Sequence, residues 1–288
     1  MSTDMNGKKP RNLGIIYAEE SSRGLAHPFF ILILDAFKQE AEAHGCNITF
    51  IHRNVAGDGT SYLDRVTSSG VDGVCMVCVD FESPEILELA ESGFPCVTVD
   101  HIFRRVPAVL SDNETGVQKL VEYAIGRGHR RIAFVHGHNN SIVTRARIKQ
   151  FRNVMDYYSL PIPDEFIREG LYDNIALTRR EVLALLQMPD RPSCILLPDD
   201  IAYLGALDAV HELDLRVPWD ISFAGYDGIP FTQTLSPKLT TVRQSTDKMG
   251  KEAASRLIKL IEQPKSKFMP CIFPVELMEG ETIADLKQ

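Results

Sequence analysis

Three acidic side chains stand where a parallel sheet would present them to a small molecule. Asp227 directly follows an apolar run at 221–226, and Asp199 and Asp200 follow another at 194–197. Short apolar runs of this kind predict buried strands, and open α/β sheets bind ligands at the carboxyl ends of their strands. A carboxylate there can accept hydrogen bonds from two adjacent hydroxyl groups. Asp227 could instead cap the turn at Gly228; Asp199 fits a ligand contact and a helix cap equally well, and Asp200 fits the cap better.

Other polar side chains also follow predicted strands. His101 comes after a strand at 96–100, and Asp112 follows the run at 106–110. Both could reach the same edge, but Asp112 could instead cap a helix beginning near residue 114, and His101 could be a solvated loop residue. His136 and His138, after a further strand, are better explained as loop histidines.

The cysteines do not form a metal or disulfide pattern. The chain has six of them, and the one CxxC pair, Cys75 and Cys78, lies inside an apolar run at 73–79. An odd spacing sends strand side chains to opposite faces, so we expect buried core thiols. Nucleotide-binding glycine motifs and recognisable catalytic motifs are also missing from the sequence. We therefore expect no cofactor, no metal and no enzymatic activity.

Strand-like and helix-like segments alternate along the whole chain. Predicted strands lie at 13–18, 48–53, 71–79, 96–100, 131–137, 194–197, 221–226 and 239–243, with a final extended segment at 271–277. Predicted helices lie at 28–44, 62–69, 84–92, 114–127, 143–158, 177–187, 201–213 and 249–261. This order is typical of βαβ units, and it predicts an α/β fold with parallel sheets covered by helices.

Composition limits the kind of protein this can be. The length of 288 residues suits two compact lobes, and a formal net charge of −8 argues against a broad phosphate-binding surface on them. The sequence has no apolar run long enough for a membrane helix and no secretory signal at its polar N-terminus, which predicts a cytoplasmic protein.

An ordered set of short motifs extends through the chain. It comprises Asp112-Asn113 with Gly116, Gly128-His129-Arg130-Arg131-Ile132, Arg147 with Phe151, Pro198-Asp199-Asp200, Val217-Pro218-Trp219-Asp220, Gly225-Tyr226-Asp227, and 239–244 with Met249-Gly250. In this order the motifs resemble the effector-binding region of the lactose-repressor/galactose-repressor family, and the match runs from about Leu13 to the C-terminal strand.

The resemblance implies a domain organisation. It predicts two Rossmann-like lobes of the periplasmic-binding-protein-like type I, joined by three crossovers, with a ligand cleft between the lobes. We expect a polar leader at 1–12, an N-terminal lobe at 13–127 plus 246–267, and a C-terminal lobe at 128–245 plus 268–288, with hinge strands at 126–131 and 244–247. The twelve residues before Leu13 are too few for the helix-turn-helix of such regulators, so operator DNA would be contacted through a domain absent from this chain. A homodimer is also implied.

The resemblance also implies the site. Asp227 matches the ligand-binding aspartate of the family, and Arg147 matches the arginine of its Arg-x-x-Gly-Phe motif, with Gln150 in place of the glycine. Asp199 stands where the family usually has Asn, which favours a ligand with an extra hydroxyl or a positive group. If the register is wrong, Arg147 is a solvated helix residue and Arg145 replaces it.

Aromatic positions complete the expected site. Phe29 and Phe30, preceded by His27, match pocket-lining positions after the first strand, and Tyr172 matches a second aromatic wall. Such rings can stack on sugar faces or can simply belong to the core, and we weight Phe29 and Tyr172 above Phe30. Trp219 is better explained as a surface turn residue.

These features predict the effector-sensing domain of a bacterial transcriptional regulator, a repressor that binds a small sugar. Two alternatives stay open at this point. A periplasmic sugar-binding transport protein has the same fold but should carry a signal peptide, and a purine-responsive regulator should have more apolar stacking and fewer acidic groups than Asp199 and Asp227 provide.

Overall fold

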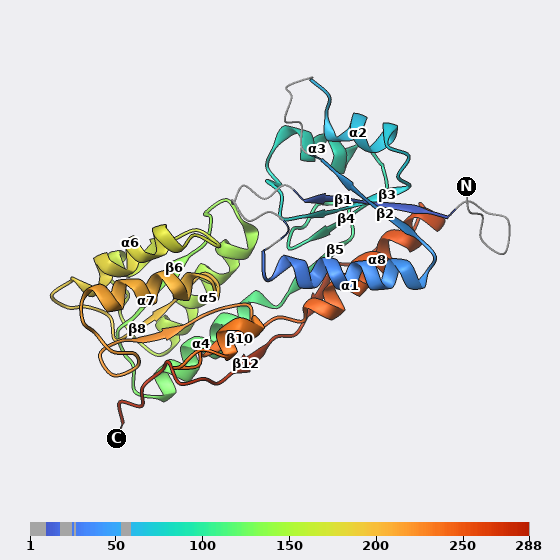
Figure 1. Ribbon diagram of the computed structural model, residues 1–288. Coiled ribbons are helices and arrows are strands. Elements are labelled where there is room, and N and C mark those ends of the chain that lie inside the picture. Colours follow the sequence, from blue (N-terminus) through green and yellow to red (C-terminus); the bar gives the residue numbers. More distant parts are fainter. Residues whose placement is uncertain (1–9, 18–24, 26, 53–58, 288) are drawn as a thin grey trace. The chain divides into compact units, whose positions relative to one another are not determined.

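The computed structural model describes residues 10–17, 25, 27–52 and 59–287 (Figure 1). The chain divides into two compact units and crosses from one to the other three times. Unit 1 comprises Met1–Ser111 and Ser245–Phe273, and unit 2 comprises Asp112–Gln244 and Pro274–Gln288.

Unit 1 is a parallel sheet with helices on both faces. In the described part of the chain its six strands have the order β11-β5-β4-β3-β1-β2, and every neighbouring pair is parallel. The strands are β1 (Asn12–Tyr17), β2 (Asn47–Ile51), β3 (Gly73–Val77), β4 (Cys96–Val99), β5 (Ala108–Ser111) and β11 (Cys271–Phe273). The helices are α1 (Phe30–Ala43), α2 (Tyr62–Ser68), α3 (Pro84–Glu91) and α8 (Thr246–Glu262).

The two faces of this sheet carry separate cores because strand side chains alternate in direction. Cys75 and Val77 of β3 pack with α1 and α8, which lie side by side (Figure 1). Val74 and Met76 of the same strand pack with α2 and α3. Cys75 is a core thiol, as predicted, and burial raises its pKa. Cys78 is half-buried beside the same core and not on the opposite face, because β3 ends at Val77 and Cys78 has a φ of +51°.

Unit 2 repeats the plan on a smaller sheet. Within the described residues its parallel strands have the order β7-β6-β8-β9, and β10 and β12 form an antiparallel pair. The strands are β6 (Ile132–His136), β7 (Ile167–Glu169), β8 (Cys194–Leu196), β9 (Ser222–Ala224), β10 (Thr241–Arg243) and β12 (Glu276–Met278). The helices are α4 (Asn113–Gly126), α5 (Ile142–Tyr157), α6 (Ile175–Leu186) and α7 (Ala202–Glu212), with 3-10 turns at Asp164–Phe166 and Pro230–Gln233.

Alternation again separates two cores. Ile132 and Phe134 of β6 pack with α4 and α5. Ala133 and Val135 pack with α6 and α7. The predicted order of helices and strands is confirmed: the apolar run at 106–110 overlaps strand β5, and the structure adds β7, which the sequence pattern did not show as a strand.

The expected lobe borders need two corrections. Helix α4 was assigned to the N-terminal lobe, but its Val117, Leu120 and Val121 pack with Phe151 of α5, so unit 2 begins at Asp112 and the supposed hinge at 126–131 lies inside it. The extended segment expected at 271–277 is two strands in different units: β11 pairs with β5 of unit 1, and β12 pairs with β10 of unit 2. The crossing therefore follows Phe273, where a border after residue 267 had been expected.

Candidate functional site

Arg147 is a buried cation in the middle of α5. Arg147 is only 5% exposed. Its Nε donates to Asn113 Oδ1 at 2.8 Å, and its Nη1 donates to the Pro198 carbonyl at 3.0 Å. The guanidinium carbon lies 3.5 Å from the centre of the Tyr226 ring, which is a cation–π contact. Arg145, by contrast, is exposed and donates to the Asn140 carbonyl. The register is therefore as predicted, and Arg147 is not a solvated arginine.

Tyr172 lies in the short segment between β7 and α6. Its hydroxyl shares a 2.7 Å hydrogen bond with Thr144 Oγ1 of α5, and its ring centre lies 5.8 Å from the Arg147 guanidinium. A Cβ atom on Gly137 would lie 2.0 Å from the Tyr172 ring, so the residue after β6 must be glycine for the ring to fit. Burial raises the pKa of the Tyr172 phenol, which keeps it neutral at physiological pH.

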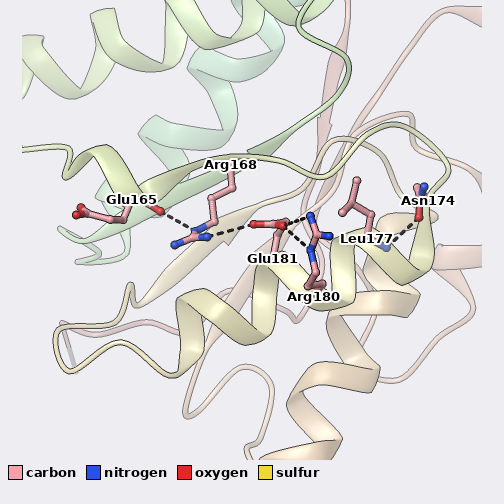
Figure 2. A network of polar contacts seen from close by, with 6 residues as sticks. All are labelled: Glu165, Arg168, Asn174, Leu177, Arg180 and Glu181. Atoms are coloured by element: carbon pink, nitrogen blue, oxygen red, sulfur yellow. Dashed lines mark hydrogen bonds and ion pairs between the residues drawn. The ribbon is translucent and has the colours of Figure 1, made fainter.

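The two elements on either side of Tyr172 are fixed by polar contacts (Figure 2). Before it, Arg168 of β7 donates to the Glu165 carbonyl and forms an ion pair with Glu181 of α6 at 3.2 Å. After it, Asn174 caps α6 by accepting from the Leu177 backbone N–H at 2.9 Å. The ring is therefore carried on a segment with both ends held.

Asp199 leaves the carboxyl end of β8 and is 3% exposed. Its Oδ1 accepts from the Ala202 backbone N–H at 2.7 Å, and its Oδ2 accepts from the Asp173 N–H at 2.6 Å. Burial raises the pKa of this carboxyl, although the two backbone donors and Arg147 oppose the shift. Of the two interpretations left open by the sequence, the cap of α7 is observed, and a ligand contact by Asp199 stays a prediction.

Asp200 does not cap that helix, so the sequence-based preference was wrong. Its Oδ2 accepts from the Ile229 N–H at 2.9 Å and from Thr232 Oγ1 at 3.0 Å, and its Oδ1 accepts from the hydroxyl of Thr241. The chain turns so that Asp200 faces the segment after β9 instead of the N-terminus of α7. Burial raises the pKa of Asp200 to about 7.

Asp227 follows β9 and faces β10. Gln244 Nε2 donates to its Oδ1 at 2.7 Å, and its own backbone N–H donates to the Val242 carbonyl at 2.8 Å. Its φ of +118° is a strained conformation for a residue with a side chain, which is common at functional sites. Burial and the nearby charges of Asp199 and Asp200 raise the pKa of Asp227, while Arg147 lowers it. These groups are thus in electrostatic contact at one edge of the unit 2 sheet.

The weaker candidates of unit 2 have other roles in the structure. Asp112 is the N-cap of α4, since its carboxylate accepts from the Thr115 N–H at 3.0 Å and the Thr115 hydroxyl at 2.7 Å. His136 is the buried last residue of β6 and not a loop residue, with Nδ1 2.8 Å from the Gly137 carbonyl oxygen. His138 does lie in the following loop. A ligand contact by Asp112 stays a prediction, and both of its carboxylate oxygens are already used in capping α4.

In unit 1, three of the predicted site residues form one group at the start of α1. His27 and Phe29 are buried, and Phe29 belongs to the core under α1. Phe30 is half-buried, with its ring 4.9 Å from His27 and 6.2 Å from Tyr17, the last residue of β1. Phe29 is therefore a core residue, and Phe30, which we had ranked lower, is the ring beside the carboxyl end of a strand.

His101 is also part of an aromatic group. Its ring stacks on Phe81 at 4.3 Å with 9° between the planes, and it lies 4.5 Å from Phe103. His101 is thus packed between rings and is not a solvated loop residue. Phe81 follows β3 as His101 follows β4, so the position of Phe81 just past a predicted strand was the signal that the sequence analysis missed.

Four polar or aromatic partners of the unit 2 site were also missed: Asn113, Thr144, Tyr226 and Gln244. Asn113 and Tyr226 stood in the quoted motifs without a role, and Thr144 lies one helical turn before Arg147. The parts of the chain described here contain no group of three or more His, Cys, Asp or Glu side chains suited to a metal ion. They also contain no helix long and apolar enough to span a membrane.

Comparison with known proteins decides the family. Residues 121–283 match the family model described as "Periplasmic binding protein-like domain", which is more than half of the 288 residues. The chain belongs to this periplasmic binding protein-like family.

Relatives within the family are regulators. The chain is 27% identical over 282 residues to the probable HTH-type transcriptional repressor ExuR of Bacillus subtilis, covering 97% of this chain and 83% of that protein. It is 27% identical over 260 residues to the HTH-type transcriptional repressor PurR of Vibrio vulnificus, covering 88% and 75%. The resemblance found in the motifs is confirmed at this level, because both relatives are repressors and the chain aligns with most of their length.

Solved structures show the same fold. A transcriptional regulator LacI from Bacillus cereus subsp. cytotoxis superposes with a TM-score of 0.88 at 24% identity, covering 95% of this chain and 98% of that one. A LacI family regulator from Enterococcus faecium with bound ribose gives a TM-score of 0.82 at 21% identity, covering 96% and 100%. These likenesses confirm the predicted α/β fold class.

Proposed function

We propose that this domain senses a small polyhydroxylated molecule, a sugar or sugar derivative, and that its occupancy controls DNA binding by a transcriptional repressor. The observation that carries the proposal is that Arg147 packs against Tyr226, the residue directly before Asp227, at the carboxyl-end edge of the unit 2 sheet. A guanidinium donates and a carboxylate accepts, so together they can bind the two kinds of hydrogen-bonding site that each sugar hydroxyl offers. The fold neighbour with bound ribose supports this ligand class.

The charge of the site favours a neutral or cationic ligand over an anionic one. Asp199 and Asp200 are buried and act electrostatically on Asp227, and Arg147 is the single buried Lys or Arg side chain among the described residues. An anionic sugar would add a further negative charge where the carboxyl pKa values are already raised by burial and mutual repulsion. The Tyr172 ring supplies an apolar face of the kind that sugars stack on.

We also propose the setting in which the sensor acts: a cytoplasmic homodimer that contacts operator DNA through a helix-turn-helix domain outside these two units. The net charge of −8 supports a separate DNA-binding part, and both relatives above are named HTH-type repressors. A transport role gains no support from such relatives.

A thermal-shift screen followed by calorimetry tests the ligand. The panel contains ribose, glucose, galactose, cellobiose, sugar phosphates and purines, because a ligand that binds only the folded protein stabilises it by about 2.7 kcal/mol at 100 times its Kd. Arg147→Ala and Asp227→Ala should abolish the shift given by a sugar. Arg145→Ala, an exposed arginine on the same helix, is the matched control and should leave the shift intact.

Two results would contradict the proposal. Stabilisation by purines alone would establish the purine-responsive alternative. A sugar that stabilises wild type and both site variants equally would show that the sugar binds elsewhere.

A further inference from the structure

Asp199 and Asp200 are adjacent in the chain, yet their carboxylates hold two different segments. Asp199 binds the segment that carries Tyr172, and Asp200 binds the segment that follows Asp227. We propose that this pair is a two-way brace at the end of β8: Asp199 is a positioning residue for Tyr172, and Asp200 is a positioning residue for Asp227. The importance of the brace for ligand binding rests on the proposed function, but the positioning itself does not.

The Asp199 arm holds a turn that would otherwise be unfavourable. Leu171 and Asp173, on either side of Tyr172, have φ values of +59° and +52°, a left-handed conformation that residues with a Cβ adopt only at an energetic cost. The bond from the Asp173 N–H to Asp199 Oδ2, at 2.6 Å, stabilises this turn. The other oxygen of Asp199 is fixed to the Ala202 N–H, at the start of α7. Asp199 therefore ties the turn to the start of α7.

Tyr172 is held from the opposite end as well. Its hydroxyl shares a hydrogen bond with Thr144 of α5, so the backbone end of the side chain is fixed through Asp173 and the phenol end through Thr144. A ring fixed at both ends keeps one orientation before a ligand arrives. Preorganisation of this kind removes an entropic cost from binding.

The Asp200 arm fixes the segment after Asp227. Its oxygens accept from the Ile229 N–H, from Thr232 and from Thr241 of β10. Asp227 and Gly228 have φ values of +118° and +69°, so the backbone between β9 and Ile229 is a strained turn that needs an external partner. A Cβ atom on Gly225 would lie 2.3 Å from Asp200 Oδ1, and the glycine therefore leaves room for this carboxylate.

At Asp199 a carboxylate is needed, because both of its partners are backbone N–H donors and an amide offers only one acceptor oxygen. In an Asp199→Asn variant one backbone N–H would face an amide NH₂ group, so one of the two bonds is lost. At Asp200 an amide could accept from the Ile229 N–H and donate to the Thr241 hydroxyl, so Asp200→Ala is the change that releases the segment after Asp227. The two substitutions are adjacent in sequence, and each serves as the control for the other.

Hydrogen exchange of the ligand-free chain, followed by mass spectrometry, tests the brace. Asp199→Asn should speed exchange of the amides at 171–174 at least tenfold and leave those at 228–232 unchanged. Asp200→Ala should do the reverse. If each variant speeds both segments equally, or neither segment, the two carboxylates do not position separate walls and the proposal is wrong.

A spectroscopic readout separates positioning from general stability. With 3-fluorotyrosine incorporated, the fluorine resonance of Tyr172, assigned through Tyr172→Phe, should shift or broaden in Asp199→Asn and keep its wild-type form in Asp200→Ala. Should Asp199→Asn fail to fold, Thr144→Val releases only the phenol end of Tyr172 and should give the same change. A Tyr172 resonance unaltered in Thr144→Val and in a folded Asp199→Asn would overturn the Asp199 arm.

Calorimetric titration with D-ribose and D-glucose distinguishes a failure of the proposed function from a failure of the brace. If either sugar binds wild type, Asp199→Asn should weaken that binding about tenfold. If neither sugar binds but the exchange pattern appears, the brace holds and the choice of ligand fails. If a sugar binds through Arg147 and the exchange pattern is absent, the proposed function holds and the brace is wrong.

Discussion

The two units place different chemistry on corresponding edges of similar sheets. In unit 2, Arg147, Asp173, Asp199 and Asp200 are buried, whereas none of the Asp, Glu, Lys and Arg side chains described in unit 1 is buried. Past the strand ends of unit 1 lie rings instead: Phe30 beside Tyr17, and His101 between Phe81 and Phe103. One architecture thus carries a charged edge in one unit and an aromatic edge in the other.

This difference shows two ways of fixing a binding surface. Buried charges are tolerated only with directional hydrogen bonds, so Arg147, Asp199 and Asp200 are each held by the donors and acceptors described above. Rings need only shape and contact, so the edge of unit 1 is fixed by packing. Substitutions in unit 1 should therefore change the stability of the fold and the shape of the surface. Substitutions in unit 2 should change the local charge and the pH dependence of stability.

The largest effect should come from the core ring of unit 1. Phe29→Ala removes a buried ring under α1 and should lower the free energy of unfolding by about 3–5 kcal/mol. The half-buried neighbour provides the comparison: Phe30→Ala should cost about 1 kcal/mol or less, because a partly exposed ring removes less area from water. Urea unfolding measures both. Equal losses would mean that Phe30 belongs to the core and does not line a binding edge.

The charged edge of unit 2 should make stability depend on pH. Burial raises the pKa of Asp200 from 3.8 to about 7, and it raises those of Asp199 and Asp227 in the same direction. The folded protein therefore holds protons that the unfolded chain releases. The stabilisation from these protons is complete below about pH 4 and is lost as pH rises through 7. Each tenfold difference in proton affinity between the folded and unfolded chains corresponds to about 1.4 kcal/mol.

Urea unfolding at pH 4 to 8 checks this dependence. The contribution of these three groups falls with rising pH, and Asp200→Asn should flatten that part of the profile. Asp35→Asn, an exposed carboxylate on α1, is the control and should leave the profile unchanged. A wild-type profile reproduced by Asp200→Asn would show that Asp200 ionises normally.

A third prediction compares ligands that differ only in charge. If the charged edge of unit 2 selects the ligand, a neutral hexose such as D-glucose should bind about tenfold more tightly than D-glucuronate, which corresponds to about 1.4 kcal/mol. Asp227→Asn removes one negative charge and should narrow that ratio, as measured by calorimetry. Tighter binding of the glucuronate would mean that Arg147 outweighs the carboxylates.

The smallest effect concerns Trp219, the single tryptophan of the chain. It is 73% exposed, as its place in a turn predicted, so its emission should be that of a solvated indole and strongly quenched by acrylamide. Trp219→Ala should change stability by less than about 0.5 kcal/mol, because surface substitutions away from special features are nearly neutral. A blue-shifted emission would place this residue in an interface.

The sequence was sufficient for the fold because periodicity reports burial. Alternating strands and amphipathic helices predicted the βαβ order, and the choice of Arg147 over Arg145 came from the motif resemblance, with which its burial on α5 agrees. The unit to which each helix belongs was harder to predict. The apolar stripe of α4 would suit a helix of either unit, and only its packing against α5 assigns it to unit 2.

The roles of the aspartates show the same limit. Their position after strands, which the sequence determines, puts Asp199, Asp200 and Asp227 at one edge of the unit 2 sheet. Which carboxylate caps a helix, which holds a distant turn and which is left to face Gln244 depends on backbone donors from residues 173, 202 and 229. Those donors are up to 29 residues from the carboxylates they bind, and no local pattern encodes such a pairing. The sequence therefore determined which groups could do the chemistry, and the tertiary structure alone decided their partners, because hydrogen bonds between segments form only where the fold brings them together.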